Sequence, residues 1–203
     1  MKVLITGFSP FDGETINPAL EAVKLLPNSI AGAEIIIAEL PVVFRQEAQV
    51  LIELVEEHNP DIVICVGQAG GRPAISVERV AINLQDARIP DNEGNTPVDE
   101  PIKADGKEAY FSSLPTRAMV QALREQGIPA ALSYSAGTYV CNDVMYHLLY
   151  WIDKHGWDIQ GGFIHVPYCP AQAANIPSSP PSMSITVIAG ALEVAIGAAV
   201  KDR

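Results

Sequence analysis

Three residues in separate segments of the chain have the side chains that cysteine hydrolysis requires. Cys141 could supply the nucleophilic sulfur, His165 the base that takes the thiol proton, and Glu78 the carboxylate that orients the imidazole ring. Their order along the chain does not decide whether they act together, because such a site assembles in space. The elements that carry them must bring them to one edge of the fold.

Cys141 stands near the start of a helix. Residues 130–134 form an apolar run that predicts a strand, residues 135–139 are mostly small and predict a turn, and helical spacing of apolar residues covers residues 144–151. This order resembles an elbow that exposes a nucleophile beside a backbone N–H. A helix N-terminus favours an anion, so we expect the thiol to ionise more readily than a free cysteine does. Taken alone, a buried structural cysteine is the more common case.

His165 and Glu78 each have a structural alternative. His165 lies near the end of a strand predicted over residues 161–166, where a site would form, but a hydrogen-bonded structural histidine fits the same position. Glu78 is the one acid in the alternating segment 75–83, which also predicts a strand, so its side chain needs either a partner or an exposed face. The case for catalysis therefore depends on all three residues occurring together.

Apolar strands and amphipathic helices alternate along much of the chain. The other predicted strands cover residues 3–6, 33–40 and 61–67. The predicted helices cover residues 17–26, 43–58, 114–125 and 182–201, besides the one after Cys141. Strands that are apolar throughout are covered on both faces and usually pair in parallel through right-handed crossovers. We therefore expect an α/β fold, a three-layer αβα sandwich with a mostly parallel, twisted central sheet and a site at the carboxyl ends of its strands.

Two long connections and the last helix carry further information. Residues 85–107 are polar and exceed the roughly 12 to 15 residues that a compact domain usually leaves structureless. We expect this loop to order over the site or against a neighbouring subunit. Residues 168–181 form a proline-rich connection. The helix predicted over residues 182–201 is apolar nearly all round, which indicates burial in the core or contact with another subunit.

The composition limits the class of protein. With 18% charged residues, residues 1–203 should form a single ordered domain with a large core. A net charge of -11 disfavours nucleic acid and an anionic membrane surface as partners, because both need a basic face. The 3 cysteines have no paired spacing, which fits a reducing compartment. We find no signal peptide and no apolar segment of ~20 residues, so we expect a soluble cytoplasmic protein.

Six motifs occur in one order and register between residue 1 and about residue 170. They are GFSPF at 7–11, VGQAGG at 66–71, ERVAIN at 78–83, DARIPDNEG at 86–94, SAGTYVCN at 135–142 and GFIHVP at 162–167. Together they resemble the pyroglutamyl peptidase I family, also called pyrrolidone-carboxylate peptidases. The resemblance implies a phosphorylase/hydrolase-like fold and a cytosolic cysteine exopeptidase, an omega peptidase that removes an N-terminal pyroglutamyl (5-oxoproline) residue from peptides. It also implies no metal and no organic cofactor, and the sequence has neither metal-ligand spacing nor a P-loop.

The resemblance also assigns roles to residues. It implies Cys141 as the nucleophile, His165 as the base and Glu78 as the orienting carboxylate. In the family, an arginine at the position of Arg88 helps to hold the oxyanion together with the backbone N–H of the cysteine. The resemblance lines the pocket for the lactam ring with Phe8, Phe11, Gln68, Tyr139 and Val140.

These pocket residues suit a pyroglutamyl N-terminus, which is a neutral five-membered lactam. Aromatic walls and one amide suffice, because there is no ammonium group to bind. Gln68 can donate to the ring carbonyl or accept from the ring N–H. Two departures from the family pattern, Asp12 where glycine is frequent and Tyr139 where phenylalanine is common, could change substrate affinity while the reaction stays the same.

We therefore expect N-terminally pyroglutamylated peptides as substrates and a homo-oligomer, either a dimer or a tetramer. The main alternative is a non-covalent binding protein or a phosphorylase-like enzyme for a small ring compound held between Phe8 and Phe11. A phosphate site would need arginines or a glycine-rich turn, and only Arg72 and Arg88 lie near the predicted strand ends. An inactive oligomeric scaffold is a third alternative. Alkylation separates these hypotheses, because only the enzyme needs a Cys141 thiolate.

Overall fold

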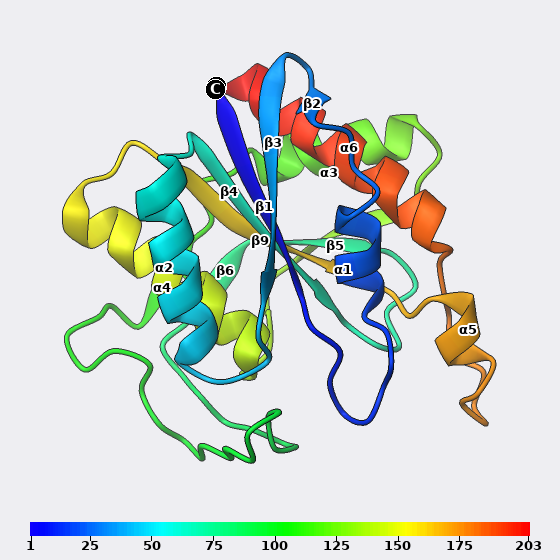
Figure 1. Cartoon of the computed structure of the whole chain (residues 1–203), viewed down its shortest axis with the longest axis horizontal. Helices are drawn as coiled ribbons and strands as arrows, with labels where there is room; N and C mark the ends of the chain where they lie inside the picture. Colours follow the sequence, from blue (N-terminus) through cyan, green and yellow to red (C-terminus); the bar gives the residue numbers. More distant parts are fainter.

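The computed structural model describes residues 1–203 as a twisted sheet between two layers of helices (Figure 1). The strands are β1 (Lys2–Phe8), β2 (Ser29–Ile30), β3 (Ala33–Leu40), β4 (Ile62–Gln68), β5 (Ile75–Glu78), β6 (Val80–Ile82), β7 (Ala109–Phe111), β8 (Ala130–Ser133) and β9 (Gln160–Val166). The helices are α1 (Pro18–Val23), α2 (Gln46–His58), α3 (Thr116–Glu125), α4 (Val140–His155), α5 (Pro170–Ala173) and α6 (Ile185–Asp202). The central sheet has the order β2-β3-β1-β4-β9-β5-β8, and β6 pairs with β7 in a separate ribbon.

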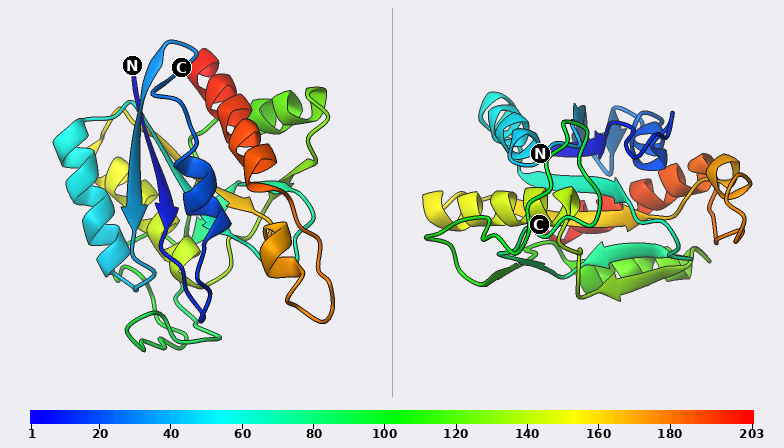
Figure 2. Two further views of the ribbon diagram at one scale, coloured as in Figure 1. Left: turned by 45° about the vertical axis from the view of Figure 1, so that its right-hand side comes forward. Right: turned by 90° about the horizontal axis from the view of Figure 1, so that it is seen from below.

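Helices cover both faces of the central sheet (Figure 2). On one face α6 packs against α1 and α3, and on the other α2 packs against α4. Alternate residues of β1 serve the two cores: Val3 and Ile5 pack with residues of α1 and α6, whereas Leu4 packs with residues of α2 and α4. A strand covered on both sides therefore buries apolar residues toward both faces. The predicted αβα sandwich with a mostly parallel sheet is confirmed.

One strand that matters to the site does not follow the predicted parallel pairing. β3, β1, β4 and β9 run parallel, but β5 is antiparallel to β9, with Ser76 opposite His165. The prediction of a strand over residues 75–83 is confirmed for most of the segment, but the structure divides it into two strands. β5 ends at Glu78, and after Arg79 the chain continues as β6 in the separate ribbon. The Arg79 guanidinium donates to a backbone carbonyl just beyond β7, which stabilises this change of sheet.

The helix that carries Cys141 begins earlier than its apolar spacing predicts. α4 starts at Val140, which places Cys141 within its first turn. The next residues, Asn142 and Asp143, are polar yet fully buried, so hydrophobic periodicity does not mark them as helical. The other four predicted helices correspond to α1, α2, α3 and α6. Only their first or last residues differ from the prediction, because helix boundaries are the least defined part of a helix.

The two long connections are held by specific contacts. Residues 85–107 contain no helix or strand, as predicted, but Gln85 and Glu100 exchange two backbone hydrogen bonds. The proline-rich connection contains the short helix α5. The apolar side of α6 packs within this chain, in the core with α1 and α3, so no second subunit is needed to cover that side. No helix is long and apolar enough to cross a membrane.

Candidate active site

Glu78 and His165 form a buried hydrogen-bonded pair on neighbouring strands. Oε1 of Glu78 lies 2.7 Å from Nδ1 of His165, and the two side chains are 0% and 4% exposed. Ser76 lies opposite His165, so Glu78, two residues further along β5, points to the same face of the sheet as the imidazole. A carboxylate accepts the hydrogen bond, so Nδ1 carries the proton and Nε2 keeps a free lone pair.

Cys141 reaches the same place from the first turn of α4. Its side chain and that of His165 both line a cleft of about 440 Å³. The sulfur lies against β4, because a Cβ placed on Gly67 would come within 2.9 Å of Sγ. The fold thus brings the cysteine and the histidine into one cleft, with Glu78 bonded to the histidine from the adjacent strand.

A narrow pocket of about 40 Å³ opens beside the sulfur. It contains the five residues that the resemblance assigns to the lactam ring, together with three others. The full lining is Phe8, Phe11, Asn17, Val42, Gln68, Tyr139, Val140 and Cys141. None of these side chains carries a formal charge at neutral pH, so the pocket suits a neutral, partly apolar group.

A chain of amide hydrogen bonds orients Gln68 in this pocket. The backbone N–H of Cys169 donates to Oε1 of Gln172, and Nε2 of Gln172 donates to Oε1 of Gln68 at 2.9 Å. The carbonyl oxygen of Gln68 is therefore occupied, and its NH₂ group is left to donate. The sequence left both roles open for Gln68, and Gln172 was missed because nothing in the proline-rich segment marks it.

Comparison with known proteins shows which family this chain belongs to. Residues 1–202 match a family model described as pyroglutamyl peptidase. The chain belongs to the pyroglutamyl peptidase family. These enzymes are cysteine-type peptidases.

Individual members of the family are similar to this chain over nearly its whole length. A pyrrolidone-carboxylate peptidase of Clostridium perfringens is 58% identical over 200 residues, covering 98% of this chain and 93% of the relative. Pyrrolidone-carboxylate peptidase 1 of Streptococcus pneumoniae is 56% identical, covering 100% and 95%. The crystal structure of Bacillus amyloliquefaciens pyroglutamyl peptidase I superposes with a TM-score of 0.95 at 51% identity, covering 98% and 97%.

Two arginines take part in the site in different ways. Nη1 of Arg72 donates to Oε1 of Glu78 at 2.7 Å, and Nη2 donates to the carbonyl of Ser135 at 3.1 Å. Arg72 therefore links the carboxylate behind His165 to the turn that precedes α4. The sequence suggested Arg72 only as a phosphate ligand, although its place just after the glycine-rich end of β4 could have marked it. Arg88 is exposed and lines the open cleft.

The two departures from the family pattern have structural explanations. The Tyr139 hydroxyl donates to the carbonyl of Pro90 at 3.0 Å, and its ring packs edge-on against Phe44 with 5.2 Å between centroids. The added oxygen thus ties the loop of residues 85–107 to the start of α4. Asp12 lines the cleft with a φ of 55°, a conformation that glycine adopts without strain.

The charge state of the site differs from the predicted one. Burial and the nearby charge of Glu78 raise the pKa of Cys141 to about 12, so the expected easy ionisation was wrong for the free enzyme. The reason is that the sulfur is desolvated against β4, which outweighs the helix N-terminus. Burial also lowers the pKa of His165. Burial opposes ionisation of Glu78, but the hydrogen bond and charge of His165 outweigh it and hold the pKa of Glu78 below its usual value. The resting site therefore holds a thiol, a neutral imidazole and a carboxylate.

This charge state predicts the pH dependence of catalysis. A neutral His165 can accept the thiol proton, so kcat/KM should fall only as pH drops through the pKa of His165, which lies below its ordinary 6.5. No rise is expected between pH 7 and 9, because the thiol does not ionise there. Initial rates measured from pH 4 to 9 test this expectation. An acid limb centred above pH 6.5 would contradict the lowered pKa of His165. A fall of the rate on the alkaline side, where an imidazolium would lose its proton, would show that the pair rests as thiolate and imidazolium.

Gly67 should be intolerant of even one added methyl group. A Cβ there would also come within 2.7 Å of Phe163, so Gly67→Ala must push the Cys141 sulfur or the aromatic ring away. A displacement of about 1 Å can cost roughly 10²-fold in rate, and we expect a loss of kcat/KM of that size. Gly190→Ala is the matched control, because nothing lies within 4 Å of the added atom. Equal activity of the two variants would contradict the close packing of the sulfur.

Proposed function

We propose that this chain hydrolyses the amide bond after an N-terminal pyroglutamyl residue of peptides and releases free pyroglutamate. The observation that carries the proposal is the uncharged pocket beside Cys141, in which the Gln68 NH₂ group is free to donate to a ring carbonyl. An aminopeptidase for ordinary N-termini would need a carboxylate or a metal at this place to bind an ammonium group. Family membership supports the same reaction, and it does not favour a binding protein or a phosphorylase.

The geometry supports a two-step reaction. Nε2 of His165 takes the proton of the Cys141 thiol as the sulfur attacks the pyroglutamyl carbonyl carbon, and Glu78 stabilises the imidazolium that forms. The imidazolium then protonates the leaving amine, which leaves a thioester on Cys141. Water, deprotonated by the same imidazole, hydrolyses the thioester and restores the thiol.

The oxyanion of each tetrahedral intermediate needs donors that are in place beforehand. The backbone N–H groups in the first turn of α4 have no intrahelical partner, and Cys141 lies in that turn. We assign the oxyanion to the Cys141 N–H and, as the second donor, to the Arg88 guanidinium in the wall of the cleft. The proposal also keeps the expectations of a single domain, a cytoplasmic location and a homo-oligomer, dimer or tetramer.

Selectivity for the lactam tests this proposal. Pyroglutamyl arylamide should be cleaved with a kcat/KM at least about 10²-fold above that of prolyl arylamide, because a proline ring leaves the Gln68 NH₂ unpaired and adds a charge to an uncharged pocket. Release of arylamine is measured for both compounds with the reduced enzyme. Iodoacetamide should abolish the activity, because His165 can take the thiol proton as the sulfur is alkylated, and pyroglutamate should slow the alkylation. A folded, reduced enzyme that cleaves neither compound would refute the proposed function.

A further inference from the structure

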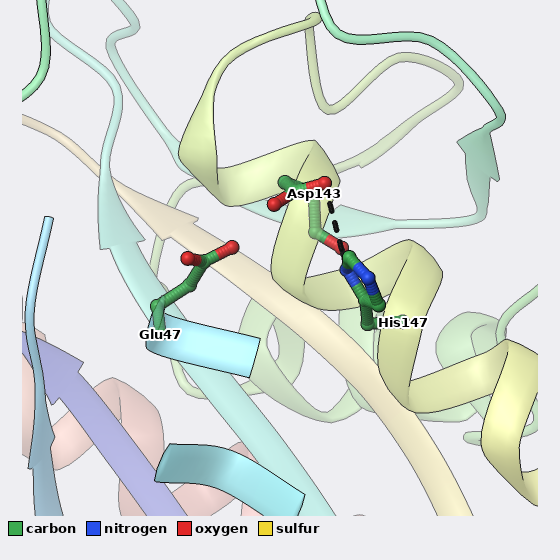
Figure 3. A group of neighbouring side chains, drawn as sticks. All are labelled: Glu47, Asp143 and His147. Carbon is green, nitrogen blue, oxygen red and sulfur yellow. Dashed lines mark hydrogen bonds and ion pairs between the residues drawn. The ribbon is translucent and has the colours of Figure 1, made fainter. Parts of the chain in front are cut away.

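Three ionisable side chains meet in the interior between α2 and α4, outside both pockets described above. Glu47 lies in the first turn of α2, and Asp143 and His147 lie one turn apart on α4 (Figure 3). One ligand-type atom from each side chain lies within 4.8 Å of those of the other two, and all three residues are buried. Hydrophobic spacing does not mark the three as a group, because Glu47 is far along the chain from Asp143 and His147.

Asp143 has the hydrogen-bond donors that a buried carboxylate needs. Nε2 of Gln85 donates to its Oδ1 at 2.8 Å, and the backbone N–H of Arg45 donates to its Oδ2 at 3.2 Å. Nδ1 of His147 lies 3.0 Å from the backbone carbonyl of Asp143 and 3.5 Å from its Oδ1. Since a carbonyl oxygen can only accept, this nitrogen carries a proton. Asp143 is therefore the ionised member of the group.

Glu47 has no such donors. Its side chain is 0% exposed, and neither carboxyl oxygen has a hydrogen-bond partner. An anion buried in this way is strongly disfavoured, whereas a carboxylic acid has an O–H that can donate to a neighbouring carboxylate. A cation between the two carboxyl groups would also satisfy them, but His147 presents an N–H to Asp143 rather than a lone pair. The arrangement therefore suits a proton shared between the carboxyl groups of Glu47 and Asp143 better than it suits a metal ion.

We propose that Glu47 is a protonated carboxylic acid at neutral pH and donates its O–H to the carboxylate of Asp143. This hydrogen bond joins the start of α2 to the first turns of α4 and makes Glu47 a positioning residue for Cys141, which lies two residues before Asp143. Asn142 lies between Cys141 and Asp143 in the chain. Its side-chain amide accepts a hydrogen bond from the backbone N–H of Ile82 and donates one to the carbonyl of Ile82. The functional part of this inference rests on the proposed role of Cys141, whereas the protonation state does not.

The other ionisable groups around Glu47 agree with this assignment. Burial, followed by the neighbouring carboxyl group of Asp143, raises the pKa of Glu47 well above its ordinary 4.5, and the nearby backbone N–H groups of Glu47 and Ala48 oppose this only in part. Burial opposes ionisation of Asp143, but His147, Glu47 and Gln85 outweigh it and lower the pKa of Asp143 to about 2. The pKa values of Cys65 on β4 and Cys141 on α4 are each raised to about 12, mainly by burial. The charge that Glu47 would carry is a further, smaller cause for both thiols. Neither thiol therefore titrates near neutral pH.

The stability of the protein should depend on pH in a way that identifies Glu47. Above the unfolded pKa of about 4.5, the unfolded chain loses a proton that the folded chain keeps. The unfolding equilibrium constant should therefore rise about tenfold per pH unit from this group, until pH passes the folded pKa of Glu47. Glu47→Gln offers an N–H donor of the same shape and cannot titrate, so its unfolding should lack this component. Glu56→Gln, on the exposed side of α2, is the matched control and should keep it.

Infrared spectroscopy tests the protonation state directly and without an activity assay. At pH 7 the wild type should show the C=O stretching band of a protonated carboxylic acid, which Glu47→Gln lacks and Glu56→Gln retains. A wild-type spectrum without this band would overturn the proposal, whichever variants fold. Elemental analysis should find no bound metal. A stoichiometric divalent metal that Glu47→Gln loses would also overturn the proposal in favour of a cation.

Rescue of turnover tests the positioning role. Glu47→Ala should lower kcat about tenfold with little change in KM, because the nucleophile is displaced while the substrate pocket stays intact. Glu47→Gln should restore kcat to near the wild-type value. If Glu47→Ala is as active as the wild type, or if Glu47→Gln is as impaired as Glu47→Ala, the positioning role is wrong. If the enzyme lacks peptidase activity altogether, the infrared result still decides the state of Glu47.

Discussion

Replacing Cys141 with alanine should lower the rate of pyroglutamyl arylamide hydrolysis by at least about 10⁴-fold. Without the sulfur no thioester can form, and His165 has no thiol to deprotonate. The remaining oxyanion donors and the lactam pocket should still bind the substrate. We therefore expect kcat to fall to near the background rate while affinity for pyroglutamate, measured by calorimetry, changes little.

Cys169→Ala is the control for this experiment. The Cys169 side chain is buried and lines neither the cleft nor the narrow pocket, and alanine keeps the backbone N–H that orients Gln172. This variant should keep the wild-type rate and remain sensitive to iodoacetamide. A folded Cys141→Ala that retained more than about a hundredth of the activity would show that another group is the nucleophile.

Replacing Glu78 with glutamine should lower kcat by about 10³-fold. The amide oxygen can still accept from the Nδ1–H of His165, so the tautomer is kept, but the negative charge that stabilises the imidazolium is lost. Glu78 also acts to raise the pKa of His165, so the acid limb of the rate should move to lower pH in this variant. The measurement is kcat across the pH range, compared with Glu57→Gln on the exposed side of α2.

Unfolding has to be measured on the same samples. Glu78 also holds Arg72, so Glu78→Gln leaves that guanidinium with a weaker partner and should lower the melting temperature. A loss of rate in a protein that is folded at the assay temperature is then a catalytic effect. An unchanged acid limb would mean that Glu78 does not act through the charge of His165.

The candidate nucleophile and the candidate base could be proposed from the sequence. Cys141 follows a strand and a small-residue turn, and His165 ends an apolar run, so both lie where a sheet presents its edge. These patterns depend on residues that are close in the chain. The same is true of the strands, because a run of apolar residues that must be covered on both faces is a local property.

The hydrogen bonds that these residues make could not be predicted from short stretches of the sequence. Glu78 bonds His165 because β5 turns antiparallel to β9, contrary to the parallel pairing that alternating strands and helices predict. Strand direction depends on which elements pack together in space, and no short window of sequence contains that information. Arg72 was undervalued for the same reason, since its partner is defined only once β5 is placed.

The chemical state of the site was also decided by tertiary structure. A position at a helix N-terminus predicts an easily ionised thiol, and the sequence could show that position. The sequence could not show that β4 desolvates the sulfur at Gly67, which raises the pKa of Cys141 instead. Glu47 and Asp143 meet only because α2 packs on α4. The sequence by itself therefore determined which side chains are available and where the strands run apolar. Only the tertiary structure decided their partners and protonation states, because burial and distance are properties of the packed chain.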